Sequence, residues 1–313
     1  MDYSFCGYHR SEVPIPSAKV AVYVQPSGND DAATIQQAID YVSQQKPDKL
    51  TGLRGAVLLG EGTFTLSDPL RIRTSGVVLR GSGREKTVLR KMGYDRGALI
   101  YIEGTHDIAV LDTLSVADTK AGSLTVTVRP APLVSSVQGG SSAFTVQGGS
   151  AALKPGTRLA IWRPSTEAWI ASLNCASFGG GKRMGYWAWH PGDIDLRWNR
   201  QILAVKGGEV TLDAPITTSI ESRWGGAKAV VYEQPGLLSE CGVENLSLES
   251  DYNHALPMDE NHCWDGIYVA DAVEVTGDEW FVPSSMLAQL RRDGVAALDE
   301  KWYPHSREPL PRP

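Results

Sequence analysis

The sequence predicts a mainly β chain that winds into stacked turns, and three observations support this fold class. Short apolar runs with a period of two follow one another through residues 57–111. Glycines separate the early runs, and no helical pattern lies between them, which excludes the βαβ units of an α/β sheet. The runs are also too short for the strands of a β-sandwich. A solenoid with about 20 residues per turn fits this pattern. The runs occupy 57–59, 63–66, 70–72, 77–79, 87–89, 98–102 and 108–111.

A short amphipathic helix is predicted before the first run, over residues 34–45. Apolar side chains recur there at the i, i+3, i+4, i+7 spacing of one buried helix face. Asp30 and Asp31 precede the helix where an N-cap belongs, and their charge suits the positive end of the helix dipole. The apolar positions are Ile35, Ala38, Ile39 and Val42.

The pattern of apolar and turn residues changes along the chain and predicts four segments. Residues 1–117 are expected to hold a lead-in, the helix and the first turns. Residues 118–235 read as an inserted antiparallel β subdomain, because alternating runs flank the hairpin signal Lys206-Gly207-Gly208. The winding pattern resumes over 236–276, and 277–313 is expected to form a C-terminal helix and a proline-rich tail.

Composition narrows the classes of partner. The chain has 313 residues, 42% hydrophobic and 21% charged, which is ordinary for a folded protein of one or two domains. A net charge of −6 disfavours nucleic acid, although basic residues gather over 80–96 as either a solvated face or a groove for an anionic polymer. No apolar run approaches the roughly 20 residues that span a membrane. The four cysteines form no CxxC pair, which disfavours a zinc site or a disulfide framework.

Several motifs resemble the pectate-lyase superfamily of right-handed parallel β-helix proteins. The helix IQQAID is followed by GAVLLGEGTFTLSDPLRI and GVVLRGSG, as at the start of that fold. The strings FCGYHRSEVPIP, KPGTRLAIWRPSTEAWI and GVENLSLES resemble one bacterial branch, and the likeness covers most of 1–275. It implies an all-β right-handed parallel β-helix with an N-terminal capping α-helix, an inserted antiparallel β subdomain and a C-terminal helix.

The resemblance also implies action on an acidic polysaccharide and a secreted or periplasmic location, although the chain begins without a signal peptide. Two departures from the family matter. The only Asp-Asp pair is Asp30-Asp31, and the N-T-D and G-H-G strings of polygalacturonase-type members are missing. The ending VPSSMLAQLRRDGVAAL follows directly on the resumed turns, so the later coils of the family are expected to be absent.

The densest polar cluster lies in SDYNHALPMDENHCWDG, in a loop that interrupts the resumed turns. Proton abstraction beside a uronate carboxylate needs a base, for which His262 and His254 are candidates. Hydrolysis needs two carboxyl groups, and Asp259, Glu260 and Asp265 are available. Asp251 and Asp259 supply oxygen ligands for a possible Ca²⁺, the one cofactor we consider. The competing interpretation is a solvated loop, and the lack of an HxxxH pair or nearby cysteine ligands argues against a transition metal.

A second candidate is the aromatic stretch MGYWAWHPGDIDLRWNR in the insertion. Aromatic faces stack on sugar rings, and arginine or histidine side chains reach hydroxyl or carboxylate groups. These aromatic residues are equally suited to anchoring the insertion. The candidate substrate-binding residues are Tyr186, Trp187, Trp189, His190, Arg197 and Arg200.

The leading hypothesis is a carbohydrate-active β-helix protein, a polysaccharide lyase that acts by β-elimination on a uronate-containing polysaccharide. A glycoside hydrolase of the same fold is one alternative. A non-catalytic glycan-binding protein, or a shortened relative without activity, is the other. Neither nucleic acid nor a membrane is an expected partner, and the sequence leaves the oligomeric state open.

Overall fold

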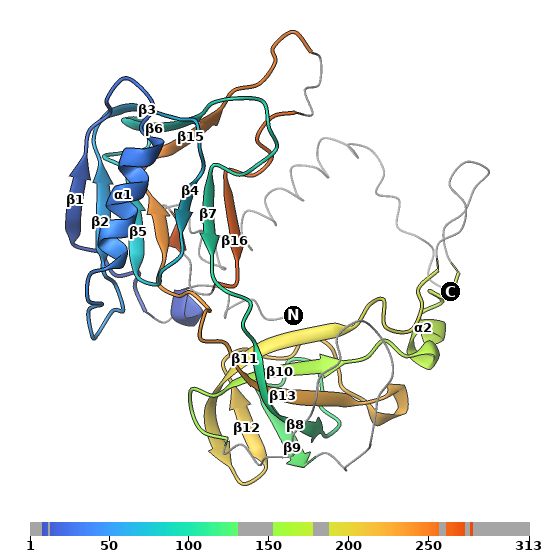
Figure 1. The fold of residues 1–313 in the computed structure, drawn as a ribbon. Helices are drawn as coiled ribbons and strands as arrows, with labels where there is room; N and C mark the ends of the chain where they lie inside the picture. The colour runs from blue at the N-terminus through green and yellow to red at the C-terminus, as the bar shows by residue number, and fades with distance from the viewer. Residues whose placement is uncertain are drawn as a thin grey trace, which may run out of the picture. The chain divides into compact units, whose positions relative to one another are not determined.

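The computed structural model describes residues 8–11, 13–130, 153–177, 188–256, 261–272 and 276–277. The chain divides into two compact units (Figure 1). The described residues within 6–105 and 236–277 form the parallel-sheet unit, and those within 106–235 form the barrel unit. The C-terminal helix and proline-rich tail predicted for 277–313 lie, apart from Gly277, outside the described residues.

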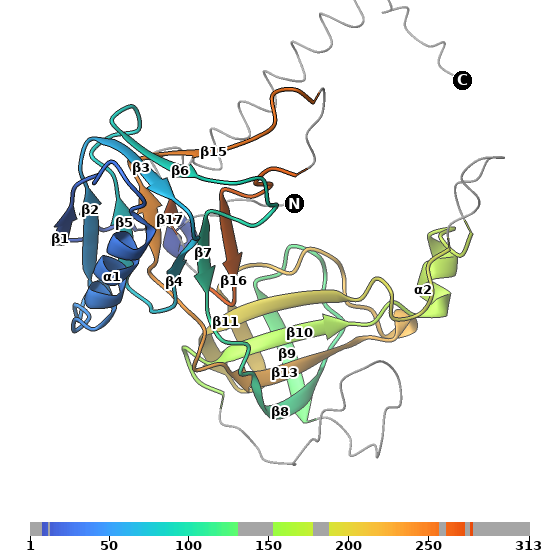
Figure 2. The same cartoon turned by 45° about the horizontal axis from the view of Figure 1, so that its top comes forward.

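Three parallel sheets make up the parallel-sheet unit (Figures 1 and 2). Their strand orders are β1-β2-β5-β14-β17, β3-β6-β15 and β4-β7-β16. The chain visits the three sheets in the same order three times, because β2, β3 and β4 are followed by β5, β6 and β7 and then by β14, β15 and β16. The strands are β1 Val20–Val24, β2 Gly55–Leu59, β3 Gly62–Leu66, β4 Leu70–Ile72, β5 Val77–Arg80, β6 Thr87–Lys91, β7 Ile100–Glu103, β14 Gly242–Glu244, β15 Ser247–Ser250, β16 Ile267–Ala270 and β17 Thr276–Gly277.

Strand register shows how each turn stacks on the one before. Gly55 pairs with Val77, 22 positions later, which is close to the predicted turn length. Leu70 pairs with Ile100, 30 positions later, because the second turn is longer between β6 and β7. We call the connection from the second sheet to the third sheet the corner. In the three successive turns it consists of residues 67–69, 92–99 and 251–266. The corner therefore grows from turn to turn while the sheets keep their register.

The core lies inside the three sheets. Phe64, Leu66, Leu79 and Leu89 are fully buried there, which agrees with the period of two in their strands. Helix α1 (Ala32–Ser43) adds its apolar face to the same core, and all four apolar positions named from the sequence are buried. The predictions of a mainly β chain, of parallel sheets and of this amphipathic helix are confirmed.

The start of α1 differs from the prediction in detail. The helix begins at Ala32, and Asp31 is the N-cap residue, but its side chain does not bond to the helix. Asp31 Oδ1 instead accepts the N–H of Ser27 at 2.9 Å. Asp30 Oδ1 accepts the N–H of Ala32 at 3.1 Å and also bonds to Ser67. Asp30 therefore supplies the bond expected of the cap and ties the helix start to the end of β3.

Six antiparallel strands close into a barrel in the other unit, in the order β10-β11-β12-β9-β8-β13. The predicted hairpin is confirmed, since Lys206 pairs with Glu209 and Gly207 adopts a φ of +62°. Leu159, Ile161 and Ile202 are fully buried in the barrel core. The strands are β8 Ala109–Val116, β9 Thr125–Pro130, β10 Arg158–Arg163, β11 Leu196–Lys206, β12 Glu209–Leu212 and β13 Ala227–Glu233.

One predicted run belongs to a different sheet. Residues 108–111 were expected to continue the winding, yet β8 pairs antiparallel with β13 and β9 in the barrel. The inward residues Leu114 and Val116 join the barrel core. A period of two is common to parallel and antiparallel strands, so the pattern alone did not distinguish them. No helix among the described residues has the length and apolar character needed to cross a membrane.

Removing a core ring should destabilise the parallel-sheet unit. Phe64→Ala leaves a cavity at a position with no exposure and is expected to lower the free energy of unfolding by about 3–5 kcal/mol. Tyr41→Ala is the control, because Tyr41 is 53% exposed on α1. Urea denaturation followed by circular dichroism measures both, and equal midpoints for the two variants would contradict this account of the core.

Candidate functional site

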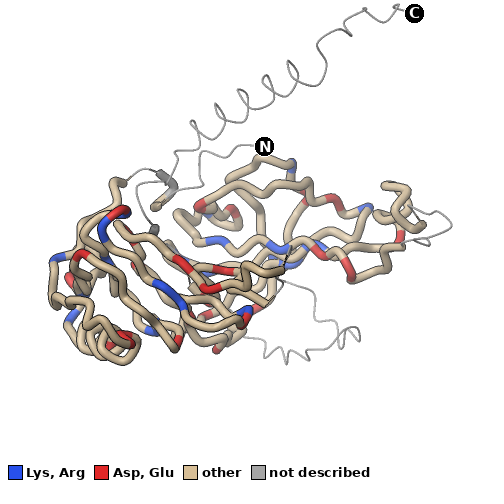
Figure 3. Tube along the Cα trace, turned by 90° about the horizontal axis from the view of Figure 1, so that it is seen from above, with Lys and Arg blue, Asp and Glu red and all other residues tan. Residues whose placement is uncertain are grey.

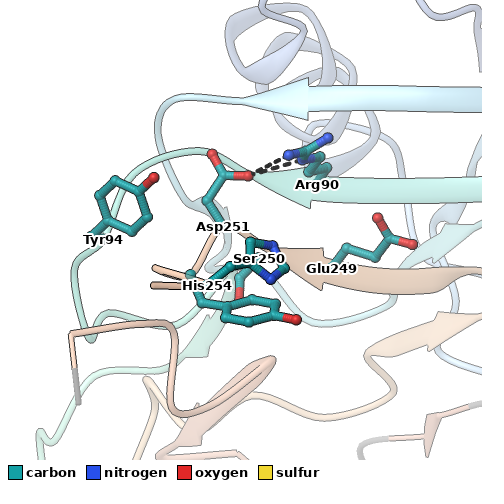
Figure 4. A pocket seen from close by; sticks show the side chains of 7 residues that line it. Arg90, Tyr94, Glu249, Ser250, Asp251 and His254 are labelled. Atoms are coloured by element: carbon teal, nitrogen blue, oxygen red, sulfur yellow. Dashed lines mark hydrogen bonds and ion pairs between the residues drawn. The ribbon is translucent and has the colours of Figure 1, made fainter. Parts of the chain in front are cut away.

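A polar pocket lies where β6 and β15 end, and it includes part of the acidic loop singled out in the sequence (Figure 4). Its volume is about 370 Å³. Four lining residues carry charge or can do so, and two tyrosines contribute aromatic faces. The lining residues are Arg90, Tyr94, Glu249, Ser250, Asp251, Tyr252 and His254.

Parallel pairing of β6 with β15 brings the charged residues together. Arg90 is the register partner of Glu249, and Lys91 is the partner of Ser250. Leu89 and Lys91 are buried on β6, so the intervening Arg90 points outward. The N–H of Asp251 donates to the carbonyl of Lys91 at 3.0 Å, which continues the pairing one residue beyond β15. The acidic loop therefore begins in register with the strand below it.

Arg90 and Asp251 form the central ion pair of the pocket. Nε and Nη2 of Arg90 donate to Asp251 Oδ1 at 3.0 and 2.6 Å. The other carboxylate oxygen, Oδ2, accepts the N–H of Gly93 at 3.4 Å. The bond to Asp251 raises the pKa of Arg90, and the charges of Asp251 and Glu249 act in the same direction. The side chain of Glu249 makes no hydrogen bond within the described part of the chain, and its charge acts on Arg90. The pocket thus holds one bonded and one available carboxylate.

A buried lysine shapes the loop that carries Tyr94. The side chain of Lys91 is 5% exposed, and its Nζ donates to Asp95 Oδ1 and to the carbonyl of Gly97, each at 2.5 Å. Asp95 Oδ1 also accepts the N–H of Gly97 at 2.8 Å. The bond from Lys91 is the main cause of a lowered pKa at Asp95, and the Gly97 N–H adds to it. These contacts order residues 92–99 across the corner.

His254 stands beside Tyr252 in the pocket wall. The two ring centroids are 3.9 Å apart with the planes tilted by 47°. A turn follows, in which Asn253 Oδ1 accepts the N–H of Ala255 at 3.0 Å and the carbonyl of Asn253 accepts the N–H of Leu256 at 3.1 Å. This turn helps to hold the imidazole of His254 in the pocket wall.

Of the other residues proposed from the acidic loop, His262 and Asp265 are described and do not line the pocket. His262 is half-buried and Asp265 is exposed, and both lie on the chain segment that leads into β16. Asp259 and Glu260 lie outside the described residues. Within the described ranges, no three His, Cys, Asp or Glu side chains gather as metal ligands. The Ca²⁺ site at Asp251 and Asp259 therefore stays a prediction.

The basic residues of 80–96 are largely paired with acids rather than forming one cationic groove. Figure 3 shows basic and acidic positions interspersed on this unit. Arg80 bonds to Glu244, and Lys86 bonds to Glu61 at 2.7 Å. Together with the pair of Arg90 and Asp251, these contacts favour the interpretation as a charge-balanced face, whereas Lys91 is buried and bonded internally.

The aromatic stretch of the insertion belongs to the barrel unit, whereas the acidic loop belongs to the parallel-sheet unit. Trp189 stacks on Trp169 of α2 (Glu167–Ser172), with centroids 6.4 Å apart. The guanidinium of Arg163 lies 4.5 Å from the Trp169 centroid. Arg163 as a whole is 2% exposed, and burial lowers its pKa. This stack anchors the segment before β11.

The remaining residues proposed from this stretch have mainly local partners. Arg200 donates to the carbonyls of Ala214 and Pro215 at 2.9 and 2.7 Å, so it supports the chain after β12. Arg197 lies 5.7 Å from the ring of Trp162. His190 is exposed and contacts Asp193 at 3.2 Å. Tyr186 and Trp187 lie outside the described residues. A substrate-binding role for this set stays a prediction.

Sequence reasoning missed most of the pocket. It named Asp251 and His254 but assigned no role to Tyr94, Glu249 or Tyr252. A usable signal was present, since TVLRK and LSLES carry Leu89 and Leu248 at matching positions, and aligning them places Arg90 beside Glu249.

Comparison with known proteins gives no family. No protein-family model matches the sequence, and no curated protein matches it. Solved structures with some likeness include the tailspike Gp54 of Acinetobacter baumannii bacteriophage AP22 in complex with A. baumannii capsular saccharide, at 9% identity and a TM-score of 0.37. The tailspike gp49 of Pseudomonas phage LKA1 has 12% identity and a TM-score of 0.37, and the tailspike gp61 of Pseudomonas phage phi297 has 13% and 0.34.

These alignments cover 80%, 80% and 77% of this chain but 34%, 36% and 31% of the three tailspikes. The chain thus spans about a third of the length of each. TM-scores this low carry no inference about function.

Asp95→Asn should reveal the pH dependence of the corner. The pKa of Asp95 is lower in the folded protein, so its stabilising effect is complete above the ordinary aspartate pKa and is lost as pH falls through the folded value. The variant should be less stable than the wild type at neutral pH. The difference should shrink on acidification below about pH 4. Urea denaturation at several pH values measures it, and a difference independent of pH would contradict the assignment.

Proposed function

We propose that this chain is a carbohydrate-active protein with a right-handed parallel β-helix fold that binds a polysaccharide at the pocket beside β6 and β15. The repeated order of visits to three parallel sheets supports the β-helix. Right-handedness follows from the strong preference of parallel β crossovers for that hand. The sequence resemblance to the pectate-lyase superfamily supports the same fold and a polysaccharide partner.

The chemistry of the pocket suits sugar hydroxyl groups. The carboxylates of Glu249 and Asp251 accept hydrogen bonds, and the guanidinium of Arg90 donates them. Tyr94 and Tyr252 are 60% and 49% exposed and offer aromatic faces to the C–H side of a pyranose ring. A long open corner accepts a polymer more readily than an enclosed cavity would.

Hydrolysis is the cleavage chemistry that the carboxylates support best. The observation that carries it is the placement of Glu249 and Asp251 two residues apart beside Arg90. Residues at i and i+2 of a strand share a face and lie about 6.6–6.8 Å apart along it. Carboxyl pairs are roughly 5–5.5 Å apart in retaining glycosidases and roughly 6.5–9.5 Å apart in inverting ones, where a water molecule lies between them. The backbone spacing of Glu249 and Asp251 suits the inverting arrangement. Glu249 donates a proton to the leaving glycosidic oxygen as that C–O bond breaks. Asp251, oriented by Arg90 and Gly93, takes a proton from a water molecule that attacks the sugar carbon from the opposite side and forms the new C–O bond.

Elimination from a uronate is the second candidate, and the position of His254 in the pocket wall favours it. The imidazole takes the proton from the carbon beside the uronate carboxylate, and the C=C bond then forms as the glycosidic oxygen leaves with its bonding electrons. The developing enolate then needs a cation, and Arg90 provides one only by sharing its bond with Asp251. This requirement ranks elimination behind hydrolysis. A uronate-containing polysaccharide is its required substrate.

The test is incubation with polygalacturonate, alginate, hyaluronan and dextran, with two products followed together. New reducing ends without ultraviolet absorbance indicate hydrolysis, and absorbance of an unsaturated product indicates elimination. Binding without either product would leave a non-catalytic glycan-binding protein. Failure to bind any of the four would reject the proposed function.

Glu249→Gln should reduce the release of reducing ends by about 100-fold or more, because it removes the proton donor while keeping the shape of the side chain. Glu61→Gln is the matched control, since Glu61 is also exposed and paired with a lysine away from the pocket. Initial rates at saturating polysaccharide measure the effect. Equal losses in both variants would show that Glu249 has no special role.

A further inference from the structure

The outer face of the third parallel sheet carries a row of side chains in register. Arg71 on β4 is the partner of Tyr101 on β7, and Tyr101 is the partner of Tyr268 on β16. The guanidinium of Arg71 lies 4.4 Å from the Tyr101 centroid, and the two tyrosine rings are 5.6 Å apart. We call Arg71, Tyr101 and Tyr268 the tyrosine row.

Contacts around the row hold it in place. Arg71 Nη1 bonds to Glu103 Oε2 at 2.8 Å, and its backbone N–H donates to Gln36 Oε1 at 2.8 Å. The hydroxyl of Tyr101 accepts the N–H of Ala98 at 3.0 Å. These bonds orient Arg71 and Tyr101, so the Tyr101 ring is already ordered before any ligand arrives.

A series of hydrogen bonds through the corner links the tyrosine row to the pocket. Tyr101 is anchored at Ala98, next to Gly97, whose carbonyl accepts Lys91 Nζ at 2.5 Å. The carbonyl of Lys91 in turn accepts the N–H of Asp251 in the pocket. On the next turn, Trp264 precedes β16. The guanidinium of Arg96 lies over its ring, 4.5 Å from the centroid.

Exposed aromatic side chains concentrate on this part of the surface. In the part of the chain that the structure describes, four of the six large aromatic side chains classed as exposed lie on the corner or on β16. They are Tyr94, Tyr252, Trp264 and Tyr268, with exposures of 60%, 49%, 59% and 45%. Exposed apolar surface gathered in one place, with polar groups around it, marks a binding surface.

We infer that the tyrosine row and Trp264 extend the pocket into a binding surface for consecutive sugars of one polysaccharide chain. This inference rests on the proposed function and adds the path that the polymer takes beyond the pocket. Sugar rings have an apolar C–H face and a rim of hydroxyl groups. The exposed rings of Tyr268 and Trp264 match the apolar face. Arg71 and Arg96, which lie over one face of Tyr101 and of Trp264, and Glu103 match the hydroxyl groups. A self-associating face would be the competing use of the same surface.

Tyr268→Ala and Trp264→Ala test the surface through binding. Affinity electrophoresis in gels containing polygalacturonate, alginate, hyaluronan or dextran gives dissociation constants for the polymer. Each variant should bind about 3- to 10-fold more weakly than the wild type, the range expected for one aromatic contact. Tyr268→Phe keeps the ring and should bind like the wild type. Tyr23→Ala and Tyr41→Ala are controls at similar exposures of 53%, away from the corner.

The dependence of affinity on oligosaccharide length supplies a second readout. Wild-type affinity should rise from short to long oligosaccharides of the polysaccharide that binds, and Tyr268→Ala should flatten that rise while leaving the affinity for the short ones unchanged. Loss of binding in Tyr252→Ala but not in Tyr268→Ala or Trp264→Ala would overturn the extended surface and keep the pocket. Absence of binding by the wild type would overturn both. A change in sedimentation without a change in affinity would assign the surface to self-association.

Discussion

Parallel hydrogen bonding between successive turns is the constraint on which the rest of the parallel-sheet unit depends. Each strand satisfies its backbone groups by aligning with strands of the neighbouring turns, and this alignment fixes which side chains become neighbours. The register partners Arg90 and Glu249 are brought together in this way, as are Tyr101 and Tyr268. The outer surface is therefore organised by the backbone before side-chain chemistry contributes.

The fold of the first two turns was predictable because its signals are local. Each short run, its flanking glycines and the face of α1 can be read within a few residues, and no long-range information is needed. The pocket was not predictable in the same way. Arg90 and Asp251 are 161 positions apart, and their contact depends on which turn follows the barrel unit. The period of apolar residues shows which positions are buried. It does not show which residues of other strands lie beside an outward residue such as Glu249.

Lys91 illustrates why polar positions mislead sequence analysis. Its place in a run of basic residues suggested a solvated or anion-binding side chain, yet it occupies an inward position on β6. The penalty of burying an ammonium group is offset because Asp95 and the Gly97 carbonyl accept its hydrogen bonds. A cation that is satisfied internally orders a loop and no longer attracts a polymer. The same distinction separates Arg200 of the barrel, bonded to backbone carbonyls, from arginines available to a ligand.

The corner between the second and third sheets lengthens over three turns, from residues 67–69 to 92–99 and then to 251–266. The strands on either side keep their pairing throughout, so the added residues disturb no core position. Loop length and core stability are consequently independent variables in this architecture. Natural variation or engineering can exchange the longest corner to change which ligand is recognised, while the buried strands continue to determine whether the chain folds.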